Sequence, residues 1–208
     1  MPMMREMRRR AMVAASAVFR LLPSDLRQWM APMLRRAYHR QIATSMPQAA
    51  KRVDTTLPWG VGVFGYMTAE SGIAEGARSS VLSLEAAGVP VRAINVEVGA
   101  FANKEASFAV AESTDNPFAV NLVHLNADHA AMLPDRIGAA NYADRYTIAF
   151  WAWELAEFPD ALVPAFETVH EVWVPSSYVA RALSAKTAKP VRVMPHRVVV
   201  ERPAAVSR

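Results

Sequence analysis

Residues 146–177 read YTIAFWAWELAEFPDALVPAFETVHEVWVPSS, and this stretch decides the fold. It holds an apolar run over 146–153, a helical segment over 159–168 and a second apolar run over 171–175. A strand, a helix and a further strand in this order predict a right-handed crossover between parallel strands. Three of the five tryptophans lie here, two of them at the end of the first run. A core strand does not need such large rings at its exit, so they also indicate a ligand crevice.

The same alternation continues on both sides of this stretch. Short apolar runs predict further strands over 60–66, 89–96, 118–126 and 191–194, and helical patterns predict helices over 73–87 and 176–185, with a loop and helix over 127–140. Gly88 suits the left-handed position that follows a helix end. We therefore expect an α/β fold with a Rossmann-like, doubly wound parallel sheet.

Charge divides the chain into two regions. Residues 1–52 hold eleven basic and two acidic residues, a net charge of +9, whereas residues 53–208 hold twelve basic and seventeen acidic residues, a net charge of −5. The second region has no basic stripe, which argues against nucleic-acid binding. We predict a basic helical arm over 1–52, a Rossmann-like domain over 53–200 and a frayed end over 201–208.

The arm permits two interpretations. Its apolar residues recur at helical spacing beside arginines, at Met7, Ala11, Ala14, Val18 and Leu21. It could be a basic amphipathic helix that lies on an anionic membrane or docks a partner, or a solvated or subunit-packed arm. The chain has no cysteine and no apolar run near 20 residues. We therefore expect a cytoplasmic protein, peripheral on the inner membrane face if the first interpretation holds.

In doubly wound sheets, ligands bind outside the carboxyl ends of the strands, so the strand exits hold the candidate site residues. At the first exit, Ser71 and Gly72 precede a helix whose free backbone N–H groups could meet a phosphate or a sugar oxygen. A plain tight turn explains a single glycine equally well. The later exits contribute Ser176, which is also a candidate helix cap, and His196.

The third strand ends in His124, Asn126 and Asp128. His124 and Asn126 share one face of the strand, and Asp128 lies in the turn that follows. The alternatives are that His124 is a satisfied core residue and that Asp128 caps the next helix. The spacing with His129 matches no strong zinc pattern, so we do not expect a metal here.

The fourth exit carries Trp151, Trp153 and Glu154. The two tryptophans are two residues apart and share a face, with Glu154 at the turn. Aromatic rings beside a carboxylate suit a carbohydrate, whose C–H faces stack while its hydroxyls form hydrogen bonds. The alternative is that one tryptophan seals the core and that Glu154 caps a helix or pairs with an arginine. No Gly-x-Ser-x-Gly elbow and no cysteine supports nucleophilic catalysis.

Several segments carry a resemblance to a known family: the glycine-bearing strand and loop over 61–76, NLVHLNAD over 121–128, WAWELAEFP over 151–159, and EVWVPSS over 171–177 with Pro195-His196. Together they resemble the N-terminal domain of a GT-B-fold glycosyltransferase of family 4, the retaining group 1 class. The resemblance covers residues 58–198 and not the arm.

The resemblance implies transfer of a sugar from a nucleotide-sugar donor to a glycan or lipid-linked acceptor, in polysaccharide biosynthesis. In that family the N-terminal domain mainly holds the acceptor. It implies that Ser71 and Gly72 approach the donor phosphates and that His124 and Asn126 lie near the transferred sugar. His124 and Glu154 are then the catalytic residues. The remaining strand-exit residues are substrate-binding: Asp128, Trp151, Trp153, Ser176 and His196.

The family's donor site, with its Glu-x7-Glu motif, lies in a C-terminal domain. The sequence stops at Arg208, near the place where the crossing between domains would begin. We therefore expect the acceptor half of a truncated or split enzyme, inactive alone, with a donor-domain polypeptide as partner. Such sites need no metal and no cofactor besides the nucleotide sugar as co-substrate. The alternative function is a non-catalytic Rossmann-like binding module that the arm attaches to a membrane or partner.

Overall fold

The computed structural model describes residues 23–26, 28–30, 33, 46–96 and 107–198. The chain divides into two units, Met1–Thr44 and Ser45–Arg208. In the first unit, all the described residues except Pro23 are helical. The predicted apolar stripe from Met7 to Leu21 and the predicted end over 201–208 lie outside the described residues.

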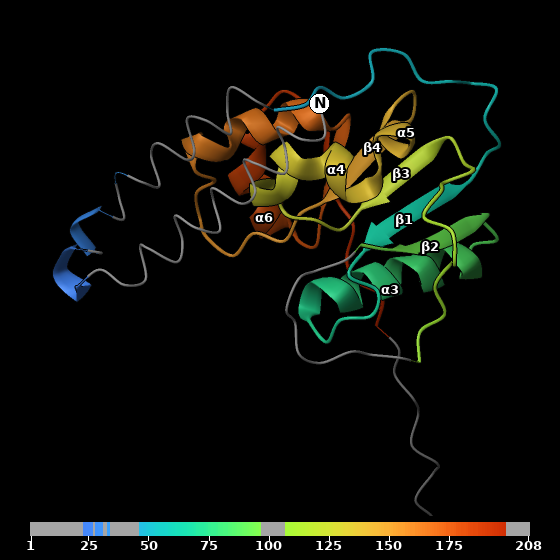
Figure 1. Ribbon diagram of the computed structural model, residues 1–208, viewed down its shortest axis with the longest axis horizontal. Coiled ribbons are helices and arrows are strands. Elements are labelled where there is room, and N and C mark those ends of the chain that lie inside the picture. Colours follow the sequence, from blue (N-terminus) through green and yellow to red (C-terminus); the bar gives the residue numbers. More distant parts are fainter. Residues whose placement is uncertain (1–22, 27, 31–32, 34–45, 97–106, 199–208) are drawn as a thin grey trace, which may run out of the picture. The chain divides into compact units, whose positions relative to one another are not determined.

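The second unit is built on a six-stranded, all-parallel sheet with the order β2-β1-β3-β4-β5-β6 (Figure 1). The strands are β1 (Val61–Gly65), β2 (Val91–Asn95), β3 (Val120–Val123), β4 (Tyr146–Phe150), β5 (Glu171–Val174) and β6 (Val191–Val193). Each lies within a stretch predicted as a strand. The expected α/β fold with a Rossmann-like, doubly wound parallel sheet is confirmed.

Helices connect the strands and flank the sheet. They are α3 (Gly72–Ala86), α4 (Leu133–Ile137), α5 (Ala139–Tyr142) and α6 (Ser177–Ser184), with 3-10 helices η1 (Ala127–Met132) and η2 (Asp160–Thr168). The segment predicted as a helix over 159–168 is therefore a 3-10 helix. It contains Pro164, which has no backbone N–H to donate to an α-helical hydrogen bond.

Each face of the sheet has its own core, because successive residues of a strand point to opposite faces. The larger core includes Phe64 and Val123 and joins them to residues of η1, η2 and α6. The smaller core includes Val63 and Leu122 and joins them to α3. Figure 1 shows α3 on one side of the sheet and α4 and α6 on the other.

The ends of α3 follow from its flanking residues. Ser71 is the N-cap, and its Oγ accepts a hydrogen bond of 3.2 Å from the N–H of Ala74. After the last turn, Gly88 has a φ of +69°, and its N–H donates to the carbonyl of Glu85 at 2.9 Å. The left-handed position predicted for Gly88 is confirmed.

Ala49 and Ala50, just before the predicted domain boundary at residue 53, belong to the second unit. The N–H of Ala49 donates to the carbonyl of Glu167 at 2.8 Å, and Nε2 of His170 donates to the carbonyl of Ala50 at 2.8 Å. The compact unit therefore begins at Ser45, earlier than the change in charge along the chain.

A buried amide network ties the loop before β3 to the sheet. Asn121 is fully buried, and its Nδ2 donates to the carbonyl of Asn141 at 2.8 Å and to Oγ1 of Thr147 at 3.1 Å. Its Oδ1 accepts from Nδ2 of Asn116 at 2.8 Å, while Oδ1 of Asn116 accepts from the N–H of Phe118 at 2.9 Å. Each amide therefore fixes the position of the next.

We expect Asn121→Ala to lower the free energy of unfolding by about 3 kcal/mol, because it leaves buried polar groups of its partners unsatisfied. Urea unfolding of the full chain measures this loss. Gln48→Ala is the matched control, because it removes an exposed amide and should change stability by less than about 0.5 kcal/mol. Equal losses in the two variants would contradict a structural role for the network.

Candidate functional site

The strand order places the topological switch point between β1 and β3. The chain runs from β1 outward to β2 and then returns to the other side of β1. In sheets of this kind, the ligand crevice lies outside the carboxyl ends of the strands at the switch point. The loop between β1 and α3 and the end of β3 meet there, so the first and third predicted exits belong to one crevice.

The N-terminus of α3 is open. A Cβ atom added to Gly72 would meet nothing within 4 Å. Ser71 caps the N–H of Ala74 with its side chain and accepts from the N–H of Glu75 with its carbonyl. Within the described part of the chain, the N–H groups of Gly72 and Ile73 remain for water or a ligand. Ser71 thus acts as a cap, while the predicted phosphate-facing N–H groups lie next to it.

His124 lies directly after β3 and is only 1 % exposed. Its Nε2 forms a hydrogen bond of 3.0 Å with Oγ of Ser80, and its ring stacks on Phe150 with 4.7 Å between centroids. Burial, and to a smaller extent the charge of His196, lowers the pKa of His124 to about 3. The ring is therefore neutral near pH 7, and its prediction as a catalytic residue stays a prediction.

The side chains of His124 and His196 both lie against Gly76 of α3. A Cβ there would lie 3.0 Å from Cε1 of His196 and 3.6 Å from Nδ1 of His124. His196 is exposed and tilts against Phe150 with 5.1 Å between ring centroids. The segment after β6 therefore returns across the sheet to the switch point.

Asn126 links the exits of two neighbouring strands. Its Oδ1 accepts a hydrogen bond of 3.0 Å from the N–H of Ala152, just after β4. Asp128 is exposed, and its carboxylate lies 3.8 Å from Nε2 of His129. The N-cap position of η1 belongs to Asn126 rather than Asp128, so the capping role considered for Asp128 is not seen.

The tryptophans of the fourth exit mainly support the core. Trp151 is 2 % exposed and stacks on Phe158 at 5.9 Å, so it takes the core position that the alternative interpretation gave to one tryptophan. Trp153 is half-buried, meets Phe158 edge-on at 5.2 Å, and donates its Nε1–H to the carbonyl of Glu157 at 2.9 Å. Glu154 is exposed, and within the described residues its side chain makes no ion pair or hydrogen bond.

Ser176 lies farther from the switch point, after β5. It is the N-cap of α6, and its Oγ accepts a hydrogen bond of 3.3 Å from the N–H of Val179. The structure gives it the capping role that the sequence also allowed.

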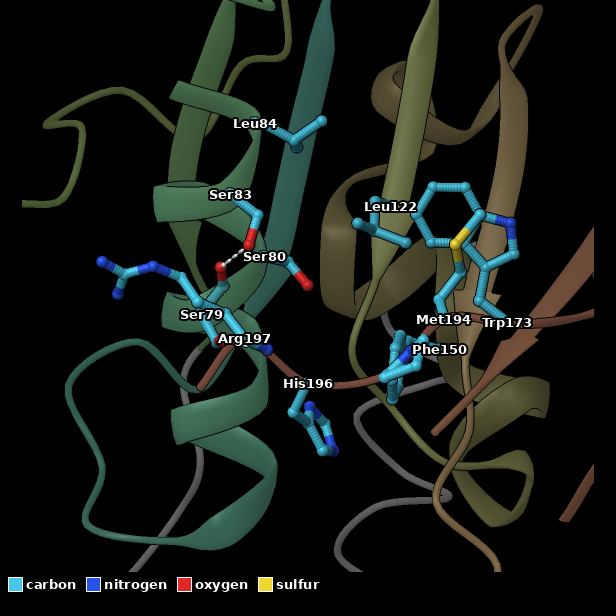
Figure 2. A pocket seen from close by; sticks show the side chains of 11 residues that line it. Ser79, Ser80, Ser83, Leu84, Leu122, Phe150, Trp173, Met194, His196 and Arg197 are labelled. Carbon is cyan, nitrogen blue, oxygen red and sulfur yellow. Dashed lines mark hydrogen bonds between the residues drawn. The ribbon is translucent and has the colours of Figure 1, made fainter. Parts of the chain in front are cut away.

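Sequence reasoning missed Ser80 and its neighbours on α3. Gly76, Ser79, Ser80 and Ser83 follow the spacing of one helix face, and this stripe of small residues was the available signal. The three serines line a cavity together with Trp173, which the sequence placed only in a strand (Figure 2).

Among the described residues, no group of three or more His, Asp or Glu side chains is placed to hold a metal ion. No helix in those parts of the chain is long and apolar enough to cross a membrane. Comparison with known proteins gives no matching family model, no matching curated protein and no matching solved structure.

The buried, neutral state of His124 predicts a pH dependence of stability. The unfolded chain binds a proton at His124 below its ordinary pKa of about 6.5, whereas the folded protein does not until about pH 3. Stability is therefore lost as the pH falls through this window, by about 2 kcal/mol between about pH 6.5 and about pH 5. His124→Gln keeps a hydrogen-bonding group for Ser80 but removes this titration.

We expect the difference in unfolding free energy between about pH 7 and about pH 5 to be smaller in His124→Gln than in the wild type, by about 2 kcal/mol. Urea unfolding at the two pH values measures it, and the other titrating groups cancel in the comparison. The same pH difference in both proteins would show that His124 is not held neutral.

Proposed function

We propose that residues 46–198 form the acceptor-side, N-terminal domain of a GT-B-fold glycosyltransferase of family 4. The strand order is the observation that carries the proposal. It puts the switch point between β1 and β3, beside the open N-terminus of α3. A nucleotide sugar and a sugar acceptor both need such a crevice between two domains.

The groups around the crevice suit these substrates. The N–H groups of Gly72 and Ile73, which have no hydrogen-bond acceptor among the described residues, favour the negative charge of a diphosphate together with the positive end of the α3 dipole. Glu154 is exposed and without a protein partner among the described residues, so its carboxylate is available to sugar hydroxyls. Asn126 holds the exits of β3 and β4 together, which keeps these groups at a fixed spacing.

The proposal divides the reaction between two domains. A second Rossmann-like domain across the cleft would bind most of the nucleotide, and residues 46–198 would bind the acceptor. The leaving diphosphate would be stabilised by helix N–H groups and basic side chains rather than by a bound ion. The chain alone should therefore bind a nucleotide sugar weakly and transfer no sugar.

Gly72→Asp separates the binding role of the α3 N-terminus from its structural role. A carboxylate at the first helical position stabilises the helix by about 0.5 kcal/mol, and the space around Gly72 accepts the side chain. The same charge repels a diphosphate. We expect a small rise in thermal stability and loss of the chemical-shift changes that UDP-glucose or GDP-mannose causes at the amides of Gly72 and Ile73 in the wild type.

Ser177→Asp is the matched control, because it places the same charge at the first residue of α6, away from the switch point. It should leave nucleotide-sugar binding unchanged. Equal effects of the two substitutions, or no response of the wild-type amides, would remove the support for a donor-facing crevice. Sugar transfer by the purified chain alone would contradict the division between two domains.

A second candidate function is a non-catalytic binding module that its arm attaches to an anionic membrane. Leu26, Trp29 and Met33 are exposed and follow the spacing of one helix face in the first unit. The surrounding 52 residues carry a net charge of +9. An apolar face with a tryptophan, within a basic segment, is typical of helices that lie on anionic lipid.

Two tryptophans of equal exposure provide the test. Trp29 in the first unit and Trp59 in the second are each 68 % exposed. We expect Trp29→Glu to weaken co-sedimentation with phosphatidylserine-containing vesicles at least about tenfold, and Trp59→Glu to leave it unchanged. Vesicles of pure phosphatidylcholine, which carry no net charge, should bind both variants only weakly. Equal binding of both variants would show that the arm does not contact the membrane through this face.

A further inference from the structure

A cavity of about 160 Å³ lies between α3 and the sheet (Figure 2). Neither Gly72 nor Glu154 is among the residues that line it. Leu122, Phe150 and Trp173 line it from β3, β4 and β5, and Ser79, Ser80, Ser83 and Leu84 line it from α3. The segment after β6, residues 194–197, closes one side. One wall is thus aromatic and apolar, and the facing wall carries three hydroxyls.

The aromatic wall is held rigidly. Nε1–H of Trp173 donates to Oε1 of Glu171 at 2.6 Å. The same carboxylate accepts a hydrogen bond of 3.2 Å from the hydroxyl of Tyr146 and pairs with Nε of Arg192 at 2.8 Å. An indole fixed in this way loses little conformational freedom when a ligand stacks on it.

The serine wall keeps hydrogen-bonding capacity. Oγ of Ser83 donates to the carbonyl of Ser79 at 2.8 Å, which leaves its lone pairs free to accept. Oγ of Ser79 accepts from the N–H of Arg197 at 3.2 Å, which leaves its proton to donate. Oγ of Ser80 forms a hydrogen bond of 3.0 Å with Nε2 of His124, and the hydroxyl keeps further hydrogen-bonding capacity for a ligand. A ligand with several hydroxyls can use all three.

The cavity favours an uncharged ligand. No carboxylate lines it. A bound cation would therefore lack an acidic partner inside the cavity. His196 and Arg197 also line the cavity. Figure 2 shows the guanidinium of Arg197 directed away from Trp173, toward the far side of α3, so it does not face a ligand that stacks on Trp173.

We propose that this cavity binds one uncharged saccharide ring, with its C–H face on Trp173 and its hydroxyls toward Ser79, Ser80 and Ser83. A cavity of about 150 Å³ is large enough for a six-membered carbon ring, and substituents of a pyranose would project through the open side. Aromatic stacking opposite hydroxyl groups is the pattern that a pyranose requires. The proposal does not depend on the glycosyltransferase function, because any saccharide-binding domain could use such a site.

The Nε1–H signal of Trp173 reports binding directly. The full chain, labelled with ¹⁵N, is titrated with the methyl glycosides of D-glucose, D-galactose and D-mannose, and the signal is assigned with Trp173→Phe. We expect at least one glycoside to shift the Trp173 signal with a dissociation constant in the millimolar range. Sorbitol, an open-chain polyol, should cause no shift because it has no ring face to stack.

Ser83→Leu tests the location. It puts a larger, apolar side chain in place of one of the hydroxyls that line the cavity. Leucine has a higher helix propensity than serine, so the variant should fold as well as the wild type. We expect at least tenfold weaker binding. Ser184→Leu, the same change at an exposed position of α6 outside the cavity, should leave binding unchanged.

Three results would overturn the proposal: no shift with any of the three glycosides, an equal shift with sorbitol, or unchanged binding in Ser83→Leu. Gly72→Asp distinguishes this site from the crevice at the switch point. It should abolish the nucleotide-sugar response and leave the glycoside response of Trp173 intact, so either site can fail without the other.

Discussion

The close packing of α3 on β1 is the contact on which the rest of the domain depends. A Cβ on Gly65 would lie 2.6 Å from the Cβ of Ala77, so only a glycine in the strand lets the helix approach this far. This depth of packing brings Gly76 against both histidines and puts Ser80 within reach of His124. A larger residue at either glycine would push the helix outward and separate these groups.

The arrangement of the sheet could be predicted from the sequence because it depends on local patterns. Apolar runs recur at short spacing, Gly88 marks the end of a helix, and all six strands lie within the predicted stretches. Two features escaped prediction. Pro164 turned a predicted helix into a 3-10 helix, and the backbone bonds of Ala49 and Ala50 joined part of the basic region to the domain. The charge of a segment does not reveal such backbone contacts.

The candidate site was predictable only in part. A parallel sheet gathers the carboxyl ends of its strands at one edge, so the strand exits could be named from the sequence. Which side chains face the crevice depends on packing between distant segments. The sequence allowed one tryptophan to seal the core, but only the structure shows that it is Trp151 and that it packs against Phe158. Ser80 and His124 are 44 positions apart, and no local pattern connects a mid-helix serine to a strand-end histidine.

The last strand, β6, also has a consequence for how copies of the domain meet one another. It is three residues long, forms one end of the sheet, and carries Arg192, whose side chain is 60 % exposed and paired with Glu171. An edge strand offers unpaired N–H and C=O groups to any strand from another molecule, and brevity and charge both limit that pairing. At the opposite end, β2 receives a further backbone hydrogen bond from Ala111 to Ala93. Within the described part of the chain, these features limit further strand pairing at both ends of the sheet.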